Sequence, residues 1–170
     1  MELWDLYTKD RQLTGKTMVR GEPRPEGYYT LGVYVWVRNK AGEYLISQRS
    51  GEKPSYPLCW ETVGGCVLAG ETSFNGAVRE VKEEVGIEVN PERLEFIYSV
   101  VDWPWNGRKP HMFNDVYLYR MEEAFNTENA VSDEVVRCRW MTSEEVRSCF
   151  REGTFIDVLE QIFEKIDREN

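Results

Sequence analysis

Short runs in which apolar and polar residues alternate occur along most of the chain. Alternation of this kind, rich in Val, Tyr and Trp, is typical of strands that bury one face. It predicts strands or extended segments at residues 2–7, 28–38, 43–49, 61–68, 94–105, 108–121 and 135–141. Turn-forming residues separate them: 8–15 is predicted to be a turn, and 21–27 and 50–59 are predicted to be loops. Asn106 and Gly107, between two alternating runs, predict a tight hairpin.

A period of three to four residues replaces the alternation in the middle of the chain and predicts a helix over 72–85. The apolar stripe of this helix consists of Phe74, Ala77, Val78, Val81 and Val85. Thr72 is suited to cap the first turn, and Gly86 is suited to end the helix in a left-handed conformation. This segment is therefore predicted to be an amphipathic helix with a defined start and end.

The C-terminal part of the chain predicts two more helices. Thr142 or Ser143 can cap a short helix that runs to Phe150, and Thr154 can cap an amphipathic helix over 155–168. Strands combined with helices at the middle and the end of a chain indicate a sheet covered by helices on both sides. The expected fold class is therefore α/β, a mixed sheet in an α/β/α sandwich.

Length and charge narrow the function classes. The 170 residues suit one domain, 1–170, and the net charge of -9 argues against a broad basic face for a nucleic-acid polymer. A phosphate-bearing substrate would need local help from a cation or a few basic residues. No apolar run is long enough to span a bilayer, and the N-terminus lacks a signal-peptide pattern, so we expect a cytoplasmic protein with no membrane partner. A homodimer is compatible with the sequence.

Cysteine and histidine usage argues against a zinc site. The four cysteines form no C-x-x-C pair, and the chain has a single histidine. Free thiols in a reducing compartment explain this pattern better.

Three carboxylates gather on one face of the predicted central helix. Glu80, Glu83 and Glu84 stand at positions i, i+3 and i+4, so they project together. Like charges this close repel one another unless a cation lies among them, and hard oxygen ligands suit Mg²⁺ or Mn²⁺. For this short stretch alone, an ordinary helix with a solvated acidic face is the competing explanation.

Residues around these carboxylates support a metal site. Arg79 lies one turn before Glu83 and can orient a carboxylate, while Glu71 can pair with Arg79 and favours the positive end of the helix. Gly64 and Gly65 let the backbone pass close to a metal ion, where the carbonyl of Gly64 can serve as a ligand.

The longer pattern decides between the two explanations. Residues 65–87 read GCVLAGETSFNGAVREVKEEVGI and match G-x5-E-x7-R-E-U-x-E-E-x-G-U at every fixed position. A chance match in this chain is on the order of 10⁻⁷ from average residue frequencies. The segment resembles a complete Nudix box. The resemblance implies the Nudix fold with a catalytic loop-helix-loop, and hydrolysis of a diphosphate bond in a nucleoside diphosphate-X or an organic X-diphosphate by metal-activated water.

The resemblance also implies a role for each residue of the box. It assigns metal binding and proton transfer to Glu80, Glu83 and Glu84. Arg79 and Glu71 would orient them. The family often takes one further acid from a variable loop, for which Glu134 is our candidate; a solvated acid at the start of a strand explains that residue equally well.

Residues 1–71 are most similar to the Nudix-type isopentenyl diphosphate isomerase and its hydrolase relatives. The matching residues are ELWDLY, T-G-K, R-G-E-P, and Gln48-Arg49-Ser50 with Lys53, Pro57 and Trp60. This likeness implies that Arg49 and Lys53 hold the substrate diphosphate, unless both are ordinary surface charges. Isomerase chemistry is not expected, because the catalytic cysteine of that enzyme aligns with Gly64 and one histidine cannot replace its several metal ligands. The alternative function is an isomerase-like diphosphate-binding protein without isomerase activity, and a buried structural thiol explains Cys66 better than a nucleophile does.

Overall fold

The computed structural model describes residues 1–102, 111–130 and 135–168, and it contains a mixed sheet of seven strands. The strands of this sheet are β3 (Thr30–Arg38), β4 (Tyr44–Arg49), β5 (Trp60–Glu61), β6 (Val63–Cys66), β7 (Leu94–Val101), β8 (Met112–Arg120) and β9 (Val135–Met141). The order is β5-β4-β3-β8-β7, with β6 also paired to β3 and β9 to β4. Strands β3 and β8 run parallel at the centre, and the other pairs are antiparallel.

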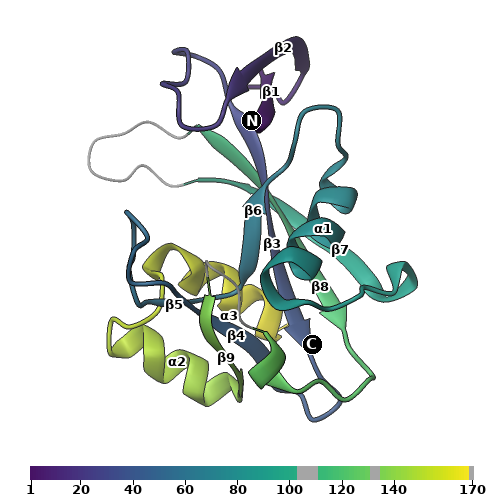
Figure 1. Ribbon diagram of the computed structural model, residues 1–170, viewed down its shortest axis with the longest axis vertical. Coiled ribbons are helices and arrows are strands. Elements are labelled where there is room, and N and C mark those ends of the chain that lie inside the picture. Colours follow the sequence, from purple (N-terminus) through teal and green to yellow (C-terminus); the bar gives the residue numbers. More distant parts are fainter. Residues whose placement is uncertain (103–110, 131–134, 169–170) are drawn as a thin grey trace.

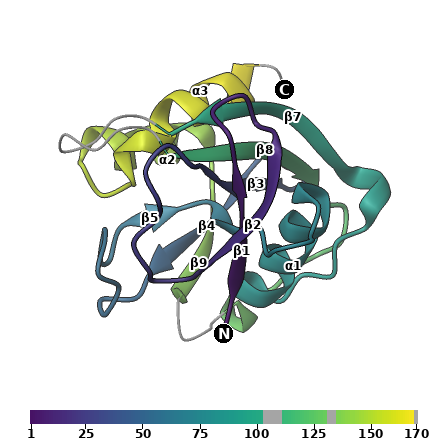
Figure 2. The same cartoon turned by 90° about the horizontal axis from the view of Figure 1, so that it is seen from above.

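Helices cover both faces of this sheet, as the sequence predicts (Figures 1 and 2). They are α1 (Ser73–Val85), α2 (Ser143–Arg151) and α3 (Glu160–Arg168), with short 3-10 turns at Pro91–Arg93, Thr127–Asn129 and Asp157–Leu159. Because side chains alternate along a strand, Val33 and Val35 of β3 pack with α1, whereas Trp36 packs with α2 and α3. The α/β/α sandwich is therefore confirmed, with one apolar core on each side of the sheet.

The N-terminal residues form a separate two-stranded hairpin of β1 (Leu3–Tyr7) and β2 (Leu13–Val19) (Figure 1). The predicted first strand is confirmed, but the turn predicted over 8–15 is wrong in its second half, because β2 already begins at Leu13. Only Met18 of β2 is buried, so its sequence carries too little apolar alternation to be recognised as a strand. Tyr7 and Tyr29 exchange backbone hydrogen bonds and fix the hairpin to the end of the main sheet.

The limits of α1 agree with the prediction from its capping residues. The Thr72 side chain accepts a hydrogen bond from the backbone N–H of Asn75, and Gly86 ends the helix at a φ of 72°. Local sequence therefore determines where the central helix starts and stops.

The last helix begins later than predicted. It starts at Glu160 rather than 155, and Thr154 is not its N-cap. The backbone N–H of Trp60 donates to the carbonyl of Thr154, and that of Ile156 donates to the carbonyl of Trp60, so this stretch pairs with β5 instead. Pairing with a strand distant in sequence overrides the local helical period here.

Two sequence predictions, the hairpin at Asn106-Gly107 and the assisting acid Glu134, lie outside the described residues. Among the helices that the structure describes, none is long and apolar enough to span a membrane.

Candidate active site

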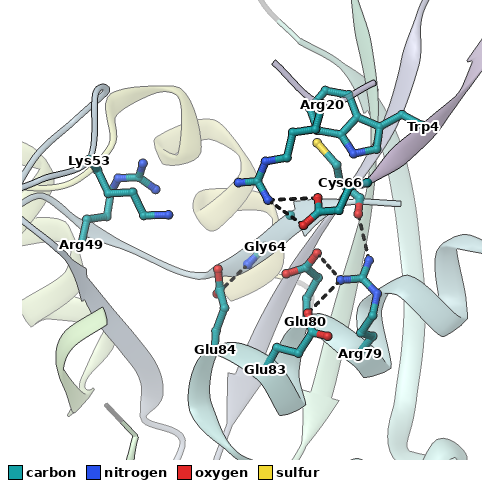
Figure 3. A pocket seen from close by; sticks show the side chains of 12 residues that line it. Trp4, Arg20, Arg49, Lys53, Gly64, Cys66, Arg79, Glu80, Glu83 and Glu84 are labelled. Carbon is teal, nitrogen blue, oxygen red and sulfur yellow. Dashed lines mark hydrogen bonds and ion pairs between the residues drawn. The ribbon is translucent and has the colours of Figure 1, made fainter. Parts of the chain in front are cut away.

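The predicted box folds as loop, helix and loop around α1, and its glutamates face one cavity. Glu80, Glu83 and Glu84 line a cavity of about 500 Å³ together with Gly64 and Gly65 of β6 (Figure 3). The structure thus brings together the residues that the sequence predicts as metal ligands.

Arg79 links the acidic residues of the box. Its guanidinium donates two hydrogen bonds to Glu71, at 3.1 and 3.0 Å, one to Glu80 at 2.8 Å and one to Glu83 at 3.0 Å. A fifth, of 2.9 Å, goes to the carbonyl of Cys66. Burial by itself would lower the pKa of Arg79, but the bonds to these carboxylates raise it above its ordinary value. Arg79 therefore stays charged and fixes Glu71 and Glu80 against the strand.

The two glycines of β6 are required by close contacts. A side chain at Gly65 would meet the Glu80 carboxyl carbon at 2.3 Å, and one at Gly64 would meet the carbonyl oxygen of Val33 at 2.6 Å. The N–H of Gly64 also donates to the Glu84 carboxylate at 3.3 Å. Absence of side chains at both positions therefore lets the glutamates lie directly on the backbone.

Two predicted substrate-binding residues, Arg49 and Lys53, lie across the cavity from α1 (Figure 3). The Nη1 atom of Arg49 donates to both carboxylate oxygens of Glu61, at 3.0 and 2.8 Å, and its Nε donates to the carbonyl of Ser55. Arg49 therefore shapes the wall of the cavity and the following loop, while Lys53 reaches the cavity from that loop.

The N-terminal hairpin and the residues next to it add side chains to which the sequence assigned no role in the site. Glu2, Trp4 and Arg20 line the same cavity. Arg20 donates from Nη1 to both oxygens of Glu2, at 3.1 and 3.0 Å. The matching segment ELWDLY pointed to a related family, but nothing local in it predicted a position beside the box.

The thiol of Cys66 lies between the hairpin and α1. Burial, and then the nearby Glu80 carboxylate, raise its pKa to about 11. The thiol is therefore protonated near neutral pH, which agrees with a structural role and not with a nucleophile.

Comparison with known proteins identifies the domain. A model of the NUDIX domain matches residues 28–159, more than half of the chain. The chain belongs to the Nudix family. An uncharacterized Nudix hydrolase of Listeria monocytogenes is 33% identical to this Nudix protein over 168 residues, which cover 96% of this chain and 94% of the relative. The expected enzyme class, Nudix hydrolase, is confirmed.

Two further comparisons concern the fold and the isomerase likeness. An isopentenyl-diphosphate Delta-isomerase of Salmonella arizonae is 29% identical over 115 residues, covering 65% of this Nudix protein and 60% of the isomerase. A crystal structure from Deinococcus radiodurans has a TM-score of 0.72 at 23% identity and covers 96% of this chain and 98% of that one. The Nudix fold is therefore confirmed, and the match to an isomerase fits the resemblance found in the sequence. The match to the family model begins after the β1–β2 hairpin.

Proposed function

We propose that this Nudix protein hydrolyses a diphosphate linkage in a small molecule, either a nucleoside diphosphate-X or an organic X-diphosphate. One observation carries the proposal: the complete box places Glu80, Glu83 and Glu84 in one cavity, with Lys53 facing them from the other side. The same cavity thus contains carboxylates that suit a divalent cation and a lysine that suits phosphate.

The donor set fits Mg²⁺ or Mn²⁺. The Nη1 atom of Arg79 already lies 2.8 Å from Glu80 and 3.0 Å from Glu83, so two carboxylates share one positive charge at this spot. Within the described ranges, no three acidic, cysteine or histidine side chains form a ready-made cage, so we expect the carboxylates to close on the ion. When bound, the ion supplies Lewis acidity, which ionises a water near neutral pH and offsets phosphoryl charge.

We assign different roles in the reaction to the residues of the box. Glu80, Glu83 and Glu84 would hold the cation, and the backbone carbonyl of Gly64 would be a further oxygen ligand. The Glu83 side chain is 60% exposed, so it reaches water most readily and is the candidate acceptor for the proton of the attacking water. Arg79 and Glu71 keep these carboxylates oriented.

Binding of the diphosphate falls to the basic residues opposite. Lys53 contacts a phosphate oxygen, and Arg49 assists by fixing the loop that carries Lys53. The assisting acid remains Glu134: the residue after it, Val135, pairs in register with Arg49, which lines the cavity.

The test is a panel assay. ADP-ribose, other nucleoside diphosphate sugars and isopentenyl diphosphate are incubated with the purified protein and Mg²⁺, and phosphate or monophosphate products are measured. We expect turnover of at least one compound, its loss on chelation and its return with Mg²⁺ or Mn²⁺. Turnover that survives thorough chelation would contradict the metal mechanism. Tight diphosphate binding without any turnover would favour the isomerase-like binding protein instead.

A further inference from the structure

The β1–β2 hairpin is docked on the loop that leads into the catalytic helix. The backbone N–H of Ala69 donates to the carbonyl of Leu3 at 2.8 Å, and the N–H of Gly70 donates to the Asp5 carboxylate at 2.7 Å. Gly70 directly precedes Glu71, the partner of Arg79. The hairpin therefore has a fixed position relative to the box, although it lies outside the matched Nudix domain.

The far side of the hairpin is also anchored. Arg11, in its turn, donates to the Asp115 carboxylate at 2.6 Å and to the Ser99 hydroxyl at 2.6 Å. Asp115 is 2% exposed, so this ion pair is shielded from water on one side. Because the hairpin is anchored at both ends, it forms a wall of the cavity with a fixed position.

Besides Arg79, which is tied to the glutamates of the box, two arginines line the cavity, and their ion pairs differ in solvent exposure. The side chains of Arg49 and Glu61 are 16% and 14% exposed, and Arg49 also bonds Ser55. Those of Arg20 and Glu2 are 53% and 45% exposed. A solvent-exposed pair is worth little, whereas a shielded pair is costly to break. Arg20 is therefore the arginine whose carboxylate partner an incoming phosphate can replace.

We propose that Arg20 binds the substrate phosphate that is not attacked, exchanging the Glu2 carboxylate for phosphate oxygens. The inference rests on the proposed function, since it assumes a diphosphate substrate in this cavity. Arg20 and Lys53 point toward one another across the cavity, with the glutamates of α1 beneath them (Figure 3). A phosphate between the Arg20 and Lys53 side chains gains charge-assisted hydrogen bonds, and the planar guanidinium of Arg20 can bind it through two donors.

The exchange gives the hairpin a second function, which is to restrain phosphate affinity. While Glu2 holds Arg20, a phosphate must displace a carboxylate before it can bind. Removal of Arg20 and removal of the Glu2 charge should therefore act in opposite directions. A purely structural pair predicts no such opposition.

Binding of imidodiphosphate, a diphosphate analogue with a P–N–P bridge that resists hydrolysis, tests this directly. Its Kd is measured by isothermal titration calorimetry with Mg²⁺. We expect Arg20→Ala to raise Kd roughly tenfold, because one charge-assisted hydrogen-bonding group is removed from the phosphate site. Glu2→Gln should lower Kd by about twofold to fivefold, the worth of an exposed ion pair. In the double variant the gain from Glu2→Gln should disappear, because no arginine is left to release.

Matched controls separate this exchange from a general change of charge. Lys16→Ala removes a cation from the same hairpin outside the cavity, and Glu22→Gln removes an acid just after it; both should leave Kd unchanged. A Glu2→Gln gain that persists without Arg20, or an Arg20→Ala variant that binds like the wild type, would overturn the proposal. So would a wild type that does not bind the probe. Since binding needs no turnover, these outcomes are independent of the panel assay.

Discussion

Replacing Arg79 with alanine tests how the acidic site is held together. The guanidinium is 22% exposed, and its partners Glu71 and Glu80 are 16% and 12% exposed. The ion pair of Arg79 with Glu83, whose side chain is 60% exposed, contributes little to stability. Loss of one partner in a fully buried pair costs about 3–5 kcal/mol. Because these groups keep some solvent, we expect a loss of about 3 kcal/mol in the free energy of unfolding of the metal-free protein.

The loss is measured by thermal unfolding in the presence of a chelator. For a domain of this size, about 3 kcal/mol corresponds to a Tm lower by about 6–12 °C. Addition of Mg²⁺ should restore part of the loss and should stabilise the variant more than the wild type, since a cation then separates the unpaired carboxylates.

Two controls accompany this variant. Arg79→Lys keeps the charge but not the planar fork, so its Tm should lie between those of wild type and Arg79→Ala. Arg151→Ala breaks an exposed pair with Glu144 and should change stability by less than about 0.5 kcal/mol. If the Tm of Arg79→Ala matched that of Arg151→Ala, Arg79 would not hold the acidic site together.

Four more outcomes are expected. Glu84→Gln should lower kcat by at least ~10²-fold with the fold intact, so near-native kcat would exclude Glu84 as a ligand. Lys53→Ala should raise KM roughly tenfold, more at low than at high ionic strength, whereas Arg49→Ala should also lower the Tm because its ion pair with Glu61 is lost. Cys66, with a pKa of about 11, should react with iodoacetamide only slowly at neutral pH and faster as the pH rises; Cys66→Ser should keep most of kcat. Incubation with isopentenyl diphosphate should yield no dimethylallyl diphosphate by mass spectrometry.

Local patterns predict the site better than they predict its surroundings. The N-cap of α1 at Thr72, its C-cap at Gly86 and the placing of Glu80 and Glu84 on one face all follow from residues within a few turns of one another. These interactions join residues that are close together in the sequence, so one sequence is enough to predict them.

Contacts between distant segments could not be predicted in this way. Glu2 and Arg20 reach the cavity because the hairpin is held by residues distant in sequence, such as Ala69, and no local period can indicate such contacts. The late start of α3 has the same origin, because the backbone around Phe155 is taken up by β5. Family resemblance implied that Arg49 holds the substrate diphosphate, which stays a prediction. Its ion pair with Glu61 was not predicted, because it depends on the pairing of β4 with β5.

The parallel pairing of β3 with β8 has a consequence for how the chain folds. In register, Thr30 pairs with Met112, which lies 82 residues later in the chain. Closing such a long loop costs conformational entropy before any hydrogen bond of the central ladder is gained, and such topologies fold slowly. The whole box lies inside this loop. During synthesis, helix α1 is therefore complete before strand β8 is available. A chain truncated before β8 would leave the apolar stripe of α1 exposed and prone to aggregation.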